Sequence, residues 1–138
     1  MAGVTDWAFR TICARMGAGL TVTEMVSSRA LVYRDRKSAG LLRKNEGSVV
    51  GAQIFGNDPE VMAQGAALAS PLLTNLAMGC PMAKVVSNGD GSALMKDIPL
   101  AARIVEAVAH AVPVPVTVKC RLGWDRGSIN VVELAQAV

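Results

Sequence analysis

Histidine and cysteine are scarce in this sequence of 138 residues, which has one histidine and three cysteines. A single histidine, His110, excludes a metal centre built on several histidines and argues against a Ser-His-Asp triad. The cysteines Cys13, Cys80 and Cys120 are far apart and include no Cys-x-x-Cys pair. The sequence therefore predicts neither a disulfide framework nor a metal site, and reduced thiols are expected.

Aromatic residues are also few, with two Trp, one Tyr and two Phe, which excludes a stacking platform for single-stranded nucleic acid. The formal net charge of +3 suits a polyanionic partner without requiring one. The longest stretch without a charge, residues 61–83, contains two prolines and several polar side chains, so no membrane span is predicted. Residues 1–6 lack the basic and apolar regions of a secretory signal, and a cytoplasmic protein is expected.

Short apolar runs alternate with amphipathic stretches, which is typical of βα units around a parallel sheet. Strands are predicted over residues 20–23, 49–55, 72–77 and 114–119. The intervening helices have side chains suited to capping their first turns, namely Asp6, Ser27 or Ser28, Asp58 followed by Pro59, Asp97 and Ser128. The fold class is therefore α/β.

The predicted elements separate the three cysteines. Cys13 falls on an apolar stripe of the first helix, with Phe9, Ile12 and Met16, and is predicted to be a core residue. Cys120 shares a strand face with valines, which is the face that packs under helices.

Cys80 lies in a Gly-Cys-Pro loop directly after a predicted strand, where α/β sheets and barrels place their chemistry. A thiol is mostly protonated at neutral pH, so Cys80 can act as a general acid as readily as a nucleophile. The lack of a histidine partner favours the acid.

Three further polar residues are candidates for binding. Lys119 and Arg121 point to the same side at the end of a predicted strand and would suit a phosphate, a carboxylate or an electron-rich cofactor ring. Gln53 lies inside an apolar strand, where its partner would be either the protein or a cofactor. Lys84, four residues after Cys80, would either steer a phosphodiester toward the site or be an ordinary surface lysine.

Five motifs in order resemble the tRNA-dihydrouridine synthases, in particular their bacterial branch. They are Met-Ala-Gly-Val-Thr-Asp from Met1, Gly-Ala-Gly-Leu-Thr-Val-Thr-Glu-Met from Gly17, Gln-Ile-Phe-Gly-Asn-Asp-Pro-Glu from Gln53, Met-Gly-Cys-Pro-Met-Ala-Lys-Val from Met78, and Val-Thr-Val-Lys-Cys-Arg-Leu-Gly-Trp from Val116. The resemblance covers nearly the whole chain. It implies a partial TIM (β/α)8 barrel of about the first five βα units, with FMN as cofactor, NADPH as reductant and tRNA as substrate.

The resemblance also implies a role for individual residues. The backbone of Met1 and Ala2 would lie against the flavin, and Gln53 and Lys119 would hydrogen-bond its ring. Cys80 would protonate uracil C5 as the reduced flavin delivers hydride to C6. Lys84 and Arg121 match basic positions near the substrate, whereas Ala77 stands where the family has an asparagine.

The family barrel has eight βα units, so residues 1–138 would be its N-terminal portion, without the C-terminal half of the barrel and without the helical tRNA-binding domain. Open strand edges would then favour self-association. A non-catalytic half-barrel that serves as an assembly module is the alternative function. A third possibility is another flavin-dependent barrel that acts on a free pyrimidine. The motifs that begin at Met78 and Val116 argue against it.

Overall fold

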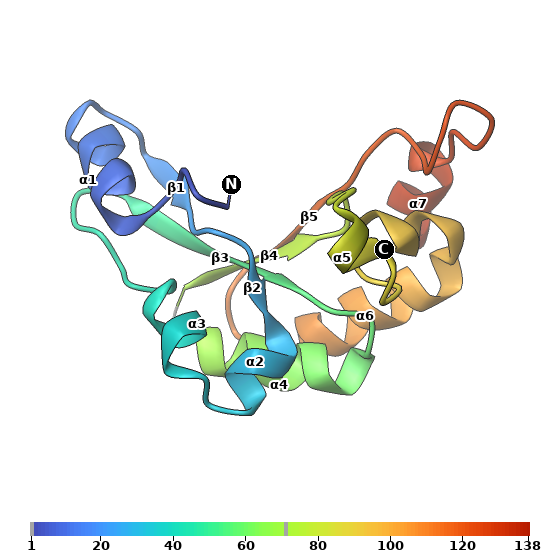
Figure 1. The fold of residues 1–138 in the computed structure, drawn as a ribbon, viewed down its shortest axis with the longest axis horizontal. Coiled ribbons are helices and arrows are strands. Elements are labelled where there is room, and N and C mark those ends of the chain that lie inside the picture. Colours follow the sequence, from blue (N-terminus) through green and yellow to red (C-terminus); the bar gives the residue numbers. More distant parts are fainter. Residues whose placement is uncertain (1, 71) are drawn as a thin grey trace.

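The computed structural model describes residues 2–70 and 72–138 and contains one parallel sheet with helices packed against it (Figure 1). The strands run in the order β1-β3-β4-β5, and β2 also pairs with β3. Their bounds are β1 Leu20–Val22, β2 Val26–Ser27, β3 Val49–Phe55, β4 Leu73–Ala77 and β5 Val116–Lys119. The helices are α1 Trp7–Arg15, α2 Ser28–Val32, α3 Arg36–Gly40, α4 Pro59–Ala69, α5 Ala83–Val86, the 3-10 helix η1 Gly91–Lys96, α6 Ile98–Ala111 and α7 Val131–Ala137.

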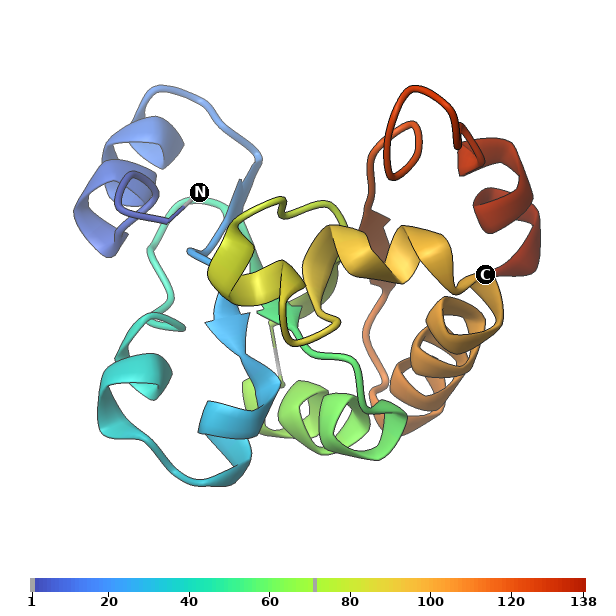
Figure 2. The same ribbon diagram turned by 45° about the vertical axis from the view of Figure 1, so that its right-hand side comes forward.

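The order of the strands identifies the architecture. β1 and β2 both pair with β3, and from β3 on each strand pairs with the next one along the chain. The helices α2, α4 and α6 all lie on the same side of the sheet (Figures 1 and 2). A doubly wound sheet reverses its strand order and carries helices on both faces, whereas a barrel winds in one direction. The sheet is therefore part of a (β/α)8 barrel, the fold that the family resemblance implied.

The strands β1 and β2 occupy one position at the edge of the sheet. Val22 pairs with Gly51, but Val26 pairs with Ile54, so the edge holds one residue more than β3 does over the same distance. The Thr23 hydroxyl fills the gap, because it accepts a hydrogen bond from the backbone N–H of Gln53 at 2.9 Å. The five strands of the described chain thus fill four barrel positions. A bulge at Thr23 separates β1 from β2 and precedes the loop residue Met25.

Most of the predicted helix starts are confirmed. The carboxylates of Asp6, Asp58 and Asp97 accept hydrogen bonds from backbone N–H groups in the first turns of α1, α4 and α6. The prediction for Ser128 is wrong: α7 starts after Asn130, and the Ser128 hydroxyl instead donates to the Asp125 carboxylate at 2.7 Å. That hydrogen bond lowers the pKa of Asp125.

The core lies between the sheet and the helices. Alternate residues of β3 and β4, Ala52, Ile54 and Leu76, are fully buried against Ala66 of α4 and Ile104 of α6. The opposite set of strand residues points to the inner face of the arc. No helix in residues 2–70 or 72–138 is long and apolar enough to cross a membrane.

The expected buried stripe of α1 is not formed. Phe9, Ile12 and Met16 are 45%, 60% and 83% exposed, and Cys13 is only partly buried, so Cys13 is not the core residue predicted. The helix instead buries Ala14 and, unexpectedly, Arg10. Periodicity predicted which residues share a face but not whether another element covers that face.

The contact between α2 and α4 depends on Gly65. A Cβ added at Gly65 would lie 2.6 Å from the Cβ and 2.9 Å from the Cα of Ser28. Glycine to alanine normally stabilises a helix interior by about 1 kcal/mol. Here we expect Gly65→Ala to lower the free energy of unfolding by about 1 to 2 kcal/mol, because overpacking outweighs that gain. Urea denaturation measures the effect.

Gly40 of α3 provides the control for Gly65→Ala. A Cβ at Gly40 meets nothing within 4 Å, so Gly40→Ala is expected to leave stability unchanged or to raise it slightly. Equal stabilisation by both substitutions would contradict the close approach of α2 and α4.

Candidate functional site

A row of polar side chains crosses the inner face of the sheet. Gln53 of β3, Asn75 of β4 and Thr117 of β5 are partners in the strand register. The Gln53 Nε2 donates to Asn75 Oδ1 at 2.8 Å, and the Asn75 Nδ2 donates to Thr117 Oγ1 at 2.8 Å. These bonds fix the orientation of the Gln53 amide.

A cavity of about 620 Å³ lies on this face, and it is called the inner-face pocket below. It brings together four residues that the sequence singled out, Ala2, Gln53, Cys80 and Lys119, from four separate segments. The remaining lining residues are Thr5, Val22, Met25, Asn75, Ala77, Gly79 and Met82. Cys80 follows β4 and Lys119 ends β5, so the pocket lies at the carboxyl ends of the strands, where barrel sites form.

The predicted strand faces around Lys119 are confirmed. Val116 and Val118 pack against the core together with Cys120, whereas Lys119 faces the inner-face pocket. The Lys119 ammonium donates to the Cys120 carbonyl oxygen at 3.3 Å. Arg121 is exposed and lies beside the loop of Cys80, because a Cβ built at Gly79 would be 3.4 Å from its Cγ.

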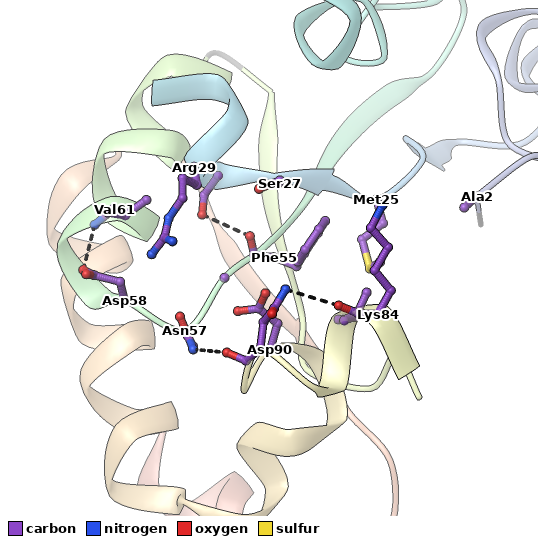
Figure 3. A pocket seen from close by; sticks show the side chains of 14 residues that line it. Ala2, Met25, Ser27, Arg29, Phe55, Asn57, Asp58, Val61, Lys84 and Asp90 are labelled. Atoms are coloured by element: carbon purple, nitrogen blue, oxygen red, sulfur yellow. Dashed lines mark hydrogen bonds between the residues drawn. The ribbon is translucent and has the colours of Figure 1, made fainter. Parts of the chain in front are cut away.

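The predicted binding residue Lys84 lies in a different cavity. The loop pocket, of about 830 Å³, is formed by the segments that follow β2, β3 and β4 (Figure 3). Its lining residues are Ala2, Met25, Ser27, Ser28, Arg29, Phe55, Gly56, Asn57, Asp58, Val61, Lys84, Val85, Asn88 and Asp90. Ala2 and Met25 line both cavities, so the two pockets adjoin.

Charges of both signs line the loop pocket. Arg29 and Lys84 supply two exposed cations, Asp58 supplies an exposed carboxylate, and Asp90 supplies a partly buried carboxyl. Burial raises the pKa of Asp90, and the positive charge of Arg29 opposes that shift. The pocket can therefore accept an anionic group at its cationic side.

The N-terminal segment that contributes Ala2 and Thr5 is held by hydrogen bonds to Arg10 and Glu24. The Arg10 guanidinium donates to the Thr5 carbonyl oxygen at 2.6 Å, and the Gly3 N–H donates to the Glu24 carboxylate. Burial lowers the pKa of Arg10, an effect opposed by the nearby carboxylates of Asp6 and Glu24. The predicted contact of Met1 with a flavin lies outside the described residues.

Sequence reasoning missed Asn75 and Met25. Asn75 has the same strand parity as Ala77, so alternation alone would have placed it on the inner face. Its hydrogen bonds to Gln53 and Thr117 depend on the register of β3, β4 and β5, which cannot be deduced from the sequence. Met25 reaches both pockets because it follows the bulge at Thr23.

Comparison with known proteins shows the family of the chain. The family model described as "Dihydrouridine synthase (Dus)" matches residues 1–138. The tRNA-dihydrouridine synthase B of Pseudomonas aeruginosa is 44% identical over 140 residues, which cover 99% of the chain and 42% of that relative. The probable tRNA-dihydrouridine synthase of Rickettsia conorii is 43% identical over 141 residues, with 99% and 43% covered. The chain therefore spans less than half the length of these relatives.

Proposed function

Because the chain belongs to the dihydrouridine synthase family, we propose that it provides the N-terminal part of a flavin-dependent barrel that reduces uridine to 5,6-dihydrouridine in tRNA. The substrate tRNA, the cofactor FMN, the reductant NADPH and a cytoplasmic location are all parts of this proposal. So is the division of the enzyme, in which the rest of the barrel and a helical tRNA-binding domain would lie outside residues 1–138.

One observation carries the proposal: Gln53, Cys80 and Lys119 line a single cavity at the carboxyl ends of three strands. The donor set fits an isoalloxazine ring, whose edge offers both hydrogen-bond acceptors and an N–H donor. The Gln53 amide is oriented by Asn75, and its carbonyl oxygen is left to accept. The Lys119 ammonium is a charged donor in the same cavity. With the backbone of Ala2, these residues would hold the flavin.

The protein's own part in the reaction is to bind, orient and protonate. The bound flavin, once reduced by NADPH, supplies a hydride for C6 of the uracil. Cys80 would donate the thiol proton to C5, so that the base gains one hydride and one proton and the thiol becomes a thiolate. The thiolate then takes a proton from solvent. Lys119 would stabilise negative charge on the flavin ring.

The basic residues outside the inner-face pocket would bind the tRNA backbone. Lys84 lines the adjoining loop pocket, and Arg121 lies beside the loop of Cys80. These cations would draw phosphates toward the pockets, and such contacts weaken as salt concentration rises.

FMN titration of the purified chain, followed by visible absorbance after desalting, tests the cofactor. We expect bound flavin, and we expect Lys119→Met to weaken FMN affinity about 10-fold to 150-fold, because a hydrogen bond from a charged group contributes roughly 1.5 to 3 kcal/mol. Lys37→Met, which removes an exposed lysine of α3 far from the pocket in sequence, is the matched control and should bind as the unaltered chain does.

The alternative function, a non-catalytic half-barrel that acts as an assembly module, makes the opposite prediction. The outer edges of β1 and β5 have no partner strand in the described chain, so such a module would pair through them. A folded chain that runs as a dimer in size-exclusion chromatography and retains no flavin would favour this alternative and contradict the proposed cofactor.

A further inference from the structure

The loop that follows Cys80 returns to contact it. The Ser92 N–H donates to the Cys80 carbonyl oxygen at 2.9 Å, where the 3-10 helix η1 begins. Gly91 precedes this bond and is buried directly against Cys80. A Cβ at Gly91 would lie 2.7 Å from the Cys80 carbonyl oxygen, 3.2 Å from its Cβ and 2.9 Å from Val85 Cγ1.

The backbone conformation of Gly91 also favours glycine. Its φ of +61° lies in the left-handed region, which side chains other than glycine adopt at a cost. Both the space and the conformation therefore require the absence of a side chain at the point where η1 meets Cys80.

We propose that Gly91, together with the Ser92 N–H, is a positioning element that holds the Cys80 thiol in the inner-face pocket. Gly91 lets η1 approach the thiol-bearing residue at van der Waals distance, and the Ser92 N–H fixes the Cys80 peptide. Cys80 lines the same pocket as Gln53 and Lys119. The importance of this position for uridine reduction rests on the proposed function, whereas the contact itself does not.

Site-resolved alkylation of the chain with iodoacetamide tests the proposal without flavin or tRNA. Mass spectrometry follows Cys13, Cys80 and Cys120 separately, from about pH 6 to pH 9, so that thiolate fraction is distinguished from access. Gly91→Ala should raise the alkylation rate of Cys80 about tenfold, because the strain of the displaced loop shifts the local opening equilibrium by that order. The rates at the other two cysteines should not change.

Gly89→Ala is the matched control, since Gly89 lies in the same loop with a φ of +83°. An added Cβ there meets only the flexible Asn57 side chain, with Nδ2 at 2.8 Å, and not Cys80. It should leave Cys80 alkylation unchanged. An equal rise in Gly89→Ala, or an equal rise at all three cysteines in Gly91→Ala, would overturn the proposal, because loop strain or global unfolding would then explain it.

Hydrogen exchange of the unaltered chain provides a second measurement should Gly91→Ala fail to fold. The Ser92 amide is expected to exchange at least about tenfold more slowly than an unprotected amide, through local opening of its hydrogen bond to the Cys80 carbonyl oxygen. Exchange at the unprotected rate would contradict the proposed contact between Ser92 and Cys80. Failure of either test leaves the proposed function standing, whereas the Cys80 substitution discussed below tests that function directly.

Discussion

Replacing Cys80 by alanine is expected to lower uridine reduction by about 100-fold to 10,000-fold, the contribution typical of a positioned general acid. The reason is that C5 of the uracil must gain a proton as C6 gains the hydride, and Cys80 is the thiol that lines the inner-face pocket. The pocket also contains Lys119, but Lys119 is proposed to bind the flavin ring and is therefore not assigned as the acid. No histidine can replace the thiol, because His110 is on α6, outside the pocket lining.

The measurement is dihydrouridine formed in unmodified tRNA. It uses the chain alone, if that is active, or the chain extended by the C-terminal part of a curated relative. Flavin absorbance of the Cys80→Ala protein should be retained, which separates loss of the acid from loss of the cofactor. Cys13→Ala is the control, since Cys13 lies on α1 away from the pocket lining. Turnover that survives Cys80→Ala would reject the acid role.

The sequence predicted the strands and the position of Cys80 because both depend on local patterns. Residues 49–55 form a strand as expected, since alternate residues such as Ala52 and Ile54 bury one face. The sorting of the cysteines succeeded for Cys120, whose strand neighbours are valines, because strand parity alone decides the face.

The sequence could not predict features that depend on contacts between distant segments. Asn75 orients Gln53 only because β3, β4 and β5 pair in one particular register. Cys13 failed as a core prediction because the apolar face of α1 is uncovered, which no helical periodicity can reveal. The burial of Arg10 reversed the usual expectation that arginine is exposed. Three acceptors from two segments, Thr5 in one and Arg43 and Asn45 in the other, explain it.

Arg10→Met is expected to lower the free energy of unfolding by about 2 to 4 kcal/mol, because it removes three hydrogen bonds that a charged group donates to buried or partly buried acceptors. The guanidinium is 2% exposed and donates to the carbonyl oxygens of Thr5 and Arg43 and to the Asn45 side chain. Methionine fills much of the same volume but donates nothing. The two loops held by Arg10 would then separate, and the segment that brings Ala2 and Thr5 to the inner-face pocket would loosen.

Arg15→Met is the matched control for Arg10→Met, since Arg15 lies in the last turn of the same helix and is exposed. We expect it to change stability by no more than about 0.5 to 1 kcal/mol. Urea denaturation of both variants measures the difference, and limited proteolysis within residues 2–6 reports the loosened segment. Similar losses for Arg10→Met and Arg15→Met would mean that the helix needs a cation but not the three bonds. Loss confined to Arg10→Met would show that a buried guanidinium, rather than apolar packing, fixes the N-terminal wall of the pocket.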